Sequence, residues 1–426
     1  MKLAYIFTSI AAFLTVEAIP FGLYSYSPSI YKIKPRTEPS KAVNGNFLHV
    51  TDIHLDSYYL PGSDPATLCH RNGTDSTNNV AGIFGTPGSQ CDSPATLIVD
   101  SFGFMKKELQ NVDFILYTGD TARHDRDPDL LRTIEDVMTA HRVTALFFSQ
   151  TYNLTKTRFI PTIGNNDVFK KDNVGPDNTI FQQLQVIWSG LNLNLTNDFL
   201  TGGYFVQDII PEKLQAISVN TIFFFEPNLE IEECKVEGSP GYLHISWIQR
   251  VLRDARKSER SIYIVGHVPP KDNTGNILYK STCYDMYINL LGSYSDVIVG
   301  QFYGHTNSDA LSVIVEDDNS DFSLISATND KSQLRSTEMV KRKVVGVLFN
   351  APSIIPVYNP AIRVFSYTIK SANHRTGTIL DWIQYYADIS SKANEPIKYV
   401  VEYVASELFG SVYKVGQKEK YYGRLH

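Results

Sequence analysis

The chain has 426 residues, of which 43% are hydrophobic and 20% are charged, and its formal net charge at pH 7 is −6. This composition excludes a disordered or fibrous protein, and it leaves enough apolar residues for a full hydrophobic core. The negative balance repels polyanions at long range, and we expect no specific nucleic-acid partner. No long linker or internal repeat divides the chain, so one large domain with additions is expected.

The N-terminal residues 1–18 have the layout of a secretory signal peptide or signal anchor. One basic residue, Lys2, precedes an apolar run that ends at Val16, and Ala18 completes a small-residue cleavage site. The run is shorter than the roughly 20 residues that span a bilayer, which favours cleavage over a type II membrane anchor. Residues 19–45 are expected to form a stalk, residues 46–370 the main domain, and residues 371–426 a C-terminal extension that packs on it.

Two further features agree with the secretory route. Three glycosylation sequons begin at Asn72, Asn153 and Asn194. The four cysteines are Cys69, Cys91, Cys234 and Cys283, and none forms a Cys-x-x-Cys pair. Pairing of neighbours in sequence closes the shortest loops, which favours disulfides between the first two and between the last two cysteines. Buried free thiols remain the alternative.

Apolar runs and amphipathic stretches alternate along most of the chain. Buried strands are expected in residues 47–55, 113–120, 159–167, 214–225, 261–270, 297–305 and 311–317. Helical spacing of apolar residues is found in residues 93–110, 128–150 and 242–257. This alternation predicts an α/β fold in which helices cover sheets.

Five of the expected strands end in a polar cluster. The clusters are Asp52-Ile-His54, Gly119-Asp120, Gly164-Asn165-Asn166-Asp167, Gly266-His267 and Gly304-His305-Thr306-Asn307. Ligands of α/β sheets bind outside the carboxyl ends of the strands, so these clusters are expected to meet in space. Glycine before a polar residue allows the tight turn that aims the next side chain into the cleft.

The types of residue in these clusters indicate a metal centre. Asp52 and His54 are two residues apart at a strand end, so alternation would place both side chains on one face. Carboxylate, imidazole and amide ligands suit Zn, Mn, Fe or Co better than calcium. Each cluster alone is typical of a turn, but five of them in this order predict a centre with two divalent metal ions.

The motifs resemble the calcineurin-like metallophosphoesterase superfamily, and within it the acid sphingomyelinase-like branch. Among its members, the fungal vacuolar endopolyphosphatases are most similar, on the strings "FLHVTDIHLDSYY", "CHR", "CDSP", "TGDTARHDRD", "GNNDV" and "GHVPP". The downstream strings "APSIIPVYNPAIRVFSY" and "TGTILDWIQYY" extend the similarity to about Asp388. The resemblance implies a four-layer sandwich in which two mixed β-sheets are flanked by helices.

The resemblance also implies a ligand set for the two metal ions, which could include Mg as well as the ions named above. Asp120 would bridge both ions. Asp52, His54 and Asn307 would complete one site, and Asn165, His267 and His305 would complete the other. Such a pair of ions lowers the pKa of a bridging water and supplies hydroxide for in-line attack on phosphorus.

Two asparagines depart from the usual superfamily pattern, which has histidine at positions 166 and 307. Asn307 would bind zinc less tightly than imidazole does. Asn166 can donate a hydrogen bond to a phosphoryl oxygen but cannot protonate a leaving group. A phosphate leaving group needs a proton less than an alkoxide does, and both asparagines resemble the endopolyphosphatase pattern, so we interpret them as specialisation for polyphosphate. His124 takes the place of a histidine that faces the phosphate in this branch, and it is expected to stabilise the transition state or donate a proton.

Basic residues flank three of the metal-ligand loops in spite of the negative net charge. We expect these residues to hold phosphates beside the scissile bond, and they are Arg123, Arg126, Lys170, Lys171 and Lys271. For any single lysine, a solvated loop charge is the alternative interpretation.

The resemblance predicts an endopolyphosphatase that hydrolyses internal phosphoanhydride bonds of inorganic polyphosphate in the vacuole lumen, or tethered to the vacuole membrane by the N-terminus. An extracellular location is the alternative. A secreted sphingomyelinase-like phosphodiesterase is the competing enzyme, but we do not expect residues 1–46 to form the helical lipid-presenting domain that usually precedes its catalytic domain. An inactive glycosylated binding protein is the third hypothesis. The sequence predicts neither the metal identity nor the oligomeric state.

Overall fold

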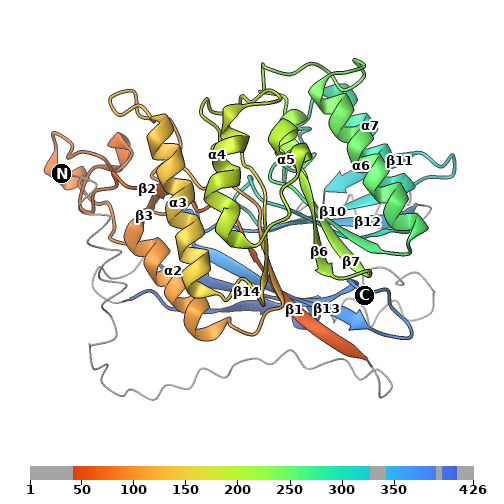
Figure 1. Ribbon diagram of the computed structural model, residues 1–426. Helices are drawn as coiled ribbons and strands as arrows, with labels where there is room; N and C mark the ends of the chain where they lie inside the picture. The colour runs from red at the N-terminus through yellow and green to blue at the C-terminus, as the bar shows by residue number, and fades with distance from the viewer. Residues whose placement is uncertain (1–41, 327–341, 390–395, 410–426) are drawn as a thin grey trace.

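A computed structural model describes residues 42–326, 342–389 and 396–409 of the chain. Figure 1 shows two β-sheets with helices on their outer faces. The expected signal segment, 1–18, and almost all of the expected stalk, 19–45, lie outside the described residues. Within the described ranges, no helix has the length and apolar character that a membrane crossing requires.

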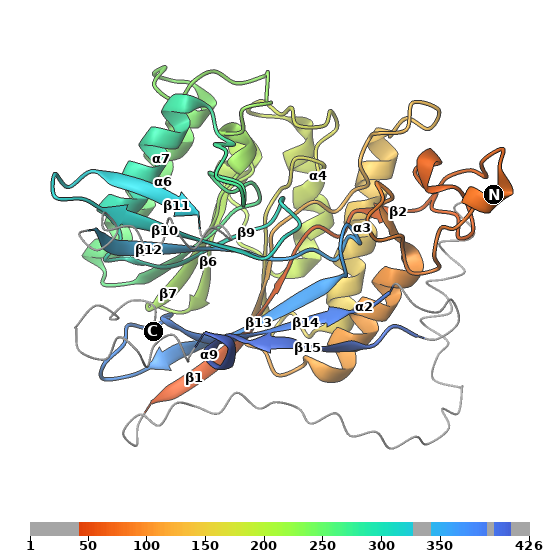
Figure 2. The same ribbon diagram turned by 180° about the vertical axis from the view of Figure 1, so that it is seen from behind.

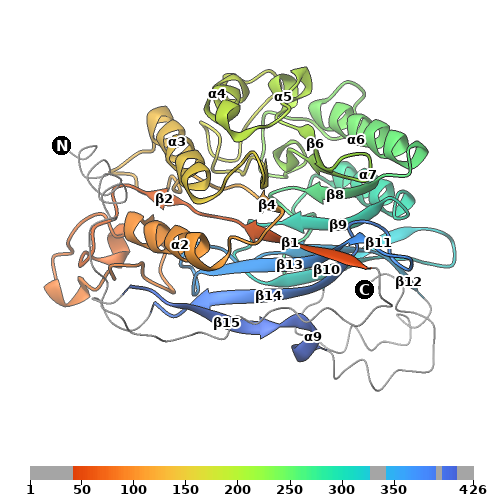
Figure 3. The same cartoon turned by 60° about the horizontal axis from the view of Figure 1, so that its bottom comes forward.

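The first sheet has six strands in the order β15-β14-β13-β1-β4-β5. Their bounds are β15 Tyr399–Val404, β14 Ile379–Ala387, β13 Ala361–Lys370, β1 Val43–Val50, β4 Phe114–Tyr117 and β5 Arg158–Pro161. Strands β1, β4 and β5 run parallel, whereas β13 pairs with β1 in the antiparallel sense. The outer strands β14 and β15 come from the range 371–426, so this part of the expected C-terminal extension pairs with the sheet itself (Figure 3).

The second sheet has seven strands in the order β11-β10-β12-β9-β8-β7-β6. Their bounds are β11 Phe322–Ser326, β10 Ala310–Glu316, β12 Lys343–Asn350, β9 Ile298–Tyr303, β8 Ser261–Val265, β7 Leu214–Ser218 and β6 Phe205–Ile210. Strands β7, β8, β9 and β12 are parallel to one another, and the remaining pairings are antiparallel. A third, two-stranded sheet joins β2 (Leu55–Asp56) and β3 (Ser93–Pro94).

The two large sheets pack face to face through an aromatic core. Phe47 of β1 stacks on Phe114 of β4 and on Phe365 of β13, with ring centroids 4.5 and 4.9 Å apart. It also meets Phe302 of β9 edge-on at 5.4 Å, across the space between the sheets. Aromatic pairs in these geometries contribute beyond the area that they bury.

Helices cover the outer faces of both sheets. The helices α2 (Ala95–Glu108) and α3 (Ile134–Thr151) lie on the first sheet, where Phe148 of α3 packs against Tyr117 and Phe159. The helices α6 (Pro240–Lys257) and α7 (Ser281–Ser293) lie on the second sheet (Figure 1). Shorter helices are α4 (Thr179–Ile187), α5 (Asn197–Gly202) and α9 (Ala405–Leu408). The predicted four-layer sandwich is therefore confirmed.

Truncation of the central aromatic ring should reveal how much the sheet packing contributes to stability. Phe47 is fully buried, so we expect Phe47→Ala to lower the free energy of unfolding by about 3–5 kcal/mol, measured by urea denaturation with the disulfides intact. Leu229→Ala is the control, because that side chain is 81% exposed, and its effect should stay within about 0.5 kcal/mol. Equal effects of the two substitutions would contradict the inter-sheet core described above.

Candidate metal centre

The loops that follow five parallel strands meet at one edge of the sandwich. They follow β1, β4 and β5 of the first sheet and β8 and β9 of the second. Five of the residues predicted as metal ligands have positive φ angles between 43° and 70°, namely Asp52, His54, Asp120, His305 and Asn307. Non-glycine residues adopt this region rarely, and such strain is concentrated at functional sites.

The backbone corrects one part of the sequence argument. Strand β1 ends at Val50, so Asp52 and His54 lie in a loop and strand alternation does not apply to them. Their positive φ angles, 52° and 43°, turn the loop so that His54 Nε2 still lies 3.6 Å from Asp52 Oδ1. The predicted proximity is therefore present for a different reason.

The first group of ligand atoms consists of Asp52, His54 and Asp120. His54 Nε2 lies 3.3 Å from Asp120 Oδ2, and the three side chains offer atoms within 4.8 Å of one another. His54 Nδ1 lies 3.0 Å from the carbonyl of Ala122, so the other ring nitrogen is directed to the carboxylates. This is the arrangement by which a backbone acceptor orients a metal-binding imidazole.

The second group consists of Asn165, His267 and His305 around the same carboxylate. Asn165 Oδ1 lies 2.9 Å from both His267 Nε2 and His305 Nδ1. His267 Nε2 also lies 3.2 Å from Asp120 Oδ2, and its Nδ1 contacts the carbonyl of Thr118 at 2.6 Å. Four candidate ligands from four loops thus converge on one point.

Asp120 belongs to both groups and is 2% exposed. Burial alone would raise the pKa of this carboxyl, but the imidazoles of His267 and His54 outweigh burial and hold it well below its usual range. In return, Asp120 raises the pKa of His267 to about 9 against the effect of burial. Burial and the neighbouring His267 lower the pKa of His305 to about 4. The carboxylate between the two groups therefore stays ionised and needs positive charge around it.

Three buried oxygen atoms fit a site for divalent metal ions. Asp52 Oδ1, Asn166 Oδ1 and Asn307 Oδ1 are buried and have no hydrogen-bond partner in the protein. Buried polar atoms without a partner are costly, and at such a site they are explained by an absent ion or water. Carboxylate, imidazole and amide donors together suit divalent transition metals. The residues therefore fit a divalent metal centre.

His124 lies beside the first group, and its ring stacks on His54 with centroids 4.1 Å apart. Asp92 accepts from its backbone N–H at 2.6 Å and pairs with its Nδ1 at 2.7 Å. Burial lowers the pKa of His124, and Asp92 opposes this only in part. The sequence alone does not reveal this role of Asp92, although Asp92 lies in the family-like string "CDSP".

Asn166 contacts the shared carboxylate through two donors. Its backbone N–H and its side-chain Nδ2 each lie 2.8 Å from an oxygen of Asp120. The next residue, Asp167, accepts from the backbone N–H groups of Asp120, Thr121 and Gly164 at 2.6–2.9 Å. Asp167 was assigned no role from the sequence, yet it joins the two turns that carry Asp120 and Asn165.

Arg132 is a third residue whose position the sequence did not reveal. It is 8% exposed, and its guanidinium donates to three backbone carbonyls, those of Arg123, Asn166 and Val168. It thereby connects the loop of His124 to the loop of Asn166. Burial lowers the pKa of Arg132.

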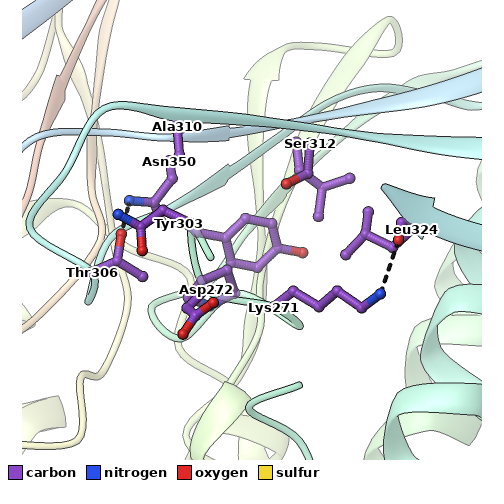
Figure 4. A pocket seen from close by; sticks show the side chains of 11 residues that line it. Lys271, Asp272, Tyr303, Thr306, Ala310, Ser312, Leu324 and Asn350 are labelled. Carbon is purple, nitrogen blue, oxygen red and sulfur yellow. Dashed lines mark hydrogen bonds between the residues drawn. The ribbon is translucent and has the colours of Figure 1, made fainter. Parts of the chain in front are cut away.

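The basic residues predicted to bind substrate fall into two kinds. Arg123 is buried and donates to the carbonyls of His124 and Leu130, and Lys271 donates to the carbonyl of Leu324 at 3.0 Å (Figure 4). Arg126 and Lys170 are exposed, and Lys171 lies 3.9 Å from Asp172. Arg126 and Lys170 therefore have charge available for an anion, whereas Arg123 and Lys271 donate to backbone carbonyls of the protein.

The cysteine pairing that the sequence favoured is confirmed. Disulfides join Cys69 to Cys91 and Cys234 to Cys283. The three sequon asparagines, Asn72, Asn153 and Asn194, are exposed, and their glycosylation stays a prediction.

Comparison with known proteins identifies the family. The family model described as calcineurin-like phosphoesterase matches residues 45–309, so the chain belongs to this family. Curated relatives named endopolyphosphatase include those of Cryptococcus neoformans, 29% identical over 78% of this chain and 59% of the relative, and Saccharomyces cerevisiae, 30% identical over 69% and 44%. The matches cover 38–59% of the curated relatives' own length. A dimetal phosphatase structure from Danio rerio is 11% identical, with 84% of this chain and 99% of that chain covered and a TM-score of 0.42.

A methyl group at Gly164 should disturb the centre through the shared carboxylate. An added Cβ would lie 2.2 Å from Asp120 Oδ1 and 2.4 Å from its backbone nitrogen. We expect Gly164→Ala to weaken divalent metal binding by at least about tenfold, in line with the cost of displacing a group that supports a ligand. Isothermal titration of the metal-free protein with Mn²⁺ measures this. Gly103→Ala is the control, because nothing lies within 4 Å of the added atom. Unchanged affinity of Gly164→Ala would contradict the site.

Proposed function

We propose that the chain is an endopolyphosphatase that uses two divalent metal ions to hydrolyse internal phosphoanhydride bonds of inorganic polyphosphate. The observation that carries the proposal is the position of Asp120, whose Oδ2 lies within 3.3 Å of ligand nitrogens from both groups. The family match and the relatives named endopolyphosphatase support it. Zn, Mn, Fe, Co and Mg are the candidate ions.

The chain's own residues would hold the ions and place the substrate. Asp52, His54 and Asn307 would hold one ion, Asn165, His267 and His305 the other, and Asp120 both. When bound, the ions neutralise charge on the phosphoryl group and activate water for in-line attack. The loops that carry these residues come from both sheets, so the sandwich fixes the geometry before substrate arrives.

His124 and Asn166 would act on the reacting phosphate. Asp92 occupies Nδ1 of His124, which leaves Nε2 for a phosphoryl or leaving oxygen. The Asn166 amide can donate a hydrogen bond but cannot protonate a leaving group. Polyphosphate suits this pair, because its leaving group is itself a phosphate and needs less protonation than an alkoxide. Arg126 and Lys170, which are exposed, would hold the neighbouring phosphates.

The disulfides and the exposed sequons support a protein of the secretory route. Within that route we propose that the protein acts in the vacuole lumen. A protein tethered to the vacuole membrane by its N-terminus is the alternative.

Removal of the bridging carboxylate should abolish hydrolysis while the fold is kept. We expect Asp120→Asn to slow the shortening of long polyphosphate by more than about 100-fold, because loss of a direct ligand exceeds the loss caused by an outer partner. A gel of product lengths, with and without chelator, measures the rate and shows whether cuts are internal. Asp208→Asn is the control, since Asp208 is exposed on β6. Full activity of Asp120→Asn, or of the wild type in excess chelator, would reject the proposal.

A histidine at position 166 should broaden the substrate range. General-acid catalysis is worth about 10²- to 10⁴-fold where the leaving group needs a proton, so Asn166→His should raise the ratio of alkyl phosphodiester to polyphosphate hydrolysis by at least about tenfold. Asn166→Ala is the matched control, because it removes the amide and supplies no proton, and it should slow both reactions together. An unchanged ratio in Asn166→His would refute the role given to Asn166. A wild type that already prefers the phosphodiester would favour the sphingomyelinase-like alternative.

A further inference from the structure

A row of polar side chains crosses the first sheet beside the aromatic core. His49 of β1 pairs in register with Arg363 of β13, Arg363 pairs with Gln384 of β14, and Gln384 pairs with Tyr403 of β15. Directly paired residues of neighbouring strands project to the same face of a sheet. The row therefore brings polar groups of four strands together on one face.

Arg363 is the charged member of this row and is 1% exposed. Its Nη2 lies 2.6 Å from Asp309 Oδ1, and its Nε donates to Gln384 Oε1 at 3.1 Å. The guanidinium also lies 5.9 Å from the ring centroid of Trp382. The guanidinium is thus enclosed by protein and has one carboxylate partner close to it.

The second oxygen of Asp309 is bound by Tyr403. The Tyr403 hydroxyl donates to Asp309 Oδ2. The same hydroxyl accepts from Trp382 Nε1 at 3.1 Å and from Arg363 Nη2 at 3.2 Å. Both oxygens of the Asp309 carboxylate are therefore held by residues of the first sheet.

Asp309 itself lies next to the second sheet. It lies directly before β10, two residues after Asn307 and four after His305. Figure 2 shows β13, β14 and β15 in one sheet and β10 in the other. The contact of Arg363 and Tyr403 with Asp309 therefore ties the ligand loop 304–309 to the opposite sheet.

The same loop is held on its other side by Asn350 at the end of β12. Asn350 Nδ2 donates to Thr306 Oγ1 at 2.7 Å (Figure 4) and to the carbonyl of Ser308 at 2.9 Å. The loop also contacts the loop after β1, because the backbone N–H of His305 donates to Asp52 Oδ2 at 3.0 Å. His305 and Asn307 both have positive φ angles, so this strained loop depends on such contacts for its shape.

The ion pair with Asp309 is a weak source of stability, because Arg363 has to leave water to form it, whereas the Asp309 side chain stays 35% exposed and its attraction is screened by solvent. Apolar residues would fill the space beside Trp382 and Phe365 at lower cost. Because the Arg363 guanidinium contacts a loop that carries predicted metal ligands, we expect the ion pair to fix the geometry of that loop rather than to stabilise the fold.

We propose that Arg363 and Tyr403 act through Asp309 as positioning residues for His305 and Asn307. The proposal rests on the proposed function only in requiring the metal centre, and it holds for any phosphoryl substrate. It assigns a role to the C-terminal strands β13, β14 and β15, which contribute none of the predicted ligands.

Cobalt titration of the metal-free protein, followed by its visible absorption, tests this proposal. The double variant Arg363→Met/Asp309→Asn removes both charges together, so neither charge is left without its partner. We expect both Co²⁺ affinities to fall about 10- to 100-fold, because the loop carries one predicted ligand of each site, while near-ultraviolet circular dichroism stays that of the wild type, as for other partners that orient metal ligands. Tyr403→Phe removes one hydroxyl and should cause a smaller fall, of at least threefold.

The control is Asp296→Asn, which breaks the exposed pair of Asp296 with Arg256 and should leave both affinities unchanged. Wild-type affinities in Tyr403→Phe, or in a folded double variant, would overturn the positioning role even if the melting temperature falls. A wild type that binds no Co²⁺ would instead refute the metal centre. Failure to cut polyphosphate with Co²⁺ binding intact would refute only the proposed substrate.

Discussion

One buried carboxylate, Asp120, sets the main constraint on the molecule. A carboxylate removed from water is stable only if positive charge and hydrogen-bond donors surround it. Asp120 meets this condition with the imidazoles of His54 and His267 and with two N–H groups of Asn166. These partners come from loops of both sheets, so the two sheets have to pack in one fixed relative position at this edge. The aromatic packing of Phe47 and its neighbours fixes that position at a distance from the centre.

Around Asp120, an outer set of residues holds the ligand loops rather than the ligands themselves. Asp167 and Arg132 bind the backbone of the two turns beside Asp120, and Asp92 orients His124. On the opposite side, Arg363 reaches the loop of His305 from another sheet. Asp167 and Arg132 contact backbone groups, Asp92 contacts the backbone and the ring of His124, and Arg363 contacts a carboxylate. These contacts hold the strained ligand loops in place.

Much of this arrangement follows from the sequence, because polar clusters that close apolar runs must meet at one sheet edge. All seven expected strand segments contain a strand, and the three expected helices form. The strands β6 and β11 to β15 are not among the expected segments, and β13 and β14 overlap strings that carry only the family resemblance. The helices α4, α5, α7 and α9 are also not among them, and α5 and α9, with six and four residues, are too short for helical periodicity to show. Asp92, Asp167, Arg132 and Arg363 act through partners distant in sequence, and no local pattern reveals such pairs.

Anomalous diffraction from crystals of the wild-type protein grown with Mn²⁺ shows directly whether Asp120 lies between two metal ions. We expect two anomalous peaks, both within bonding distance of the Asp120 carboxylate. One peak should also be coordinated by Asp52, His54 and Asn307, and the other by Asn165, His267 and His305. A single peak, or two peaks of which one is not bound by Asp120, would show that Asp120 does not bridge a pair of metal ions.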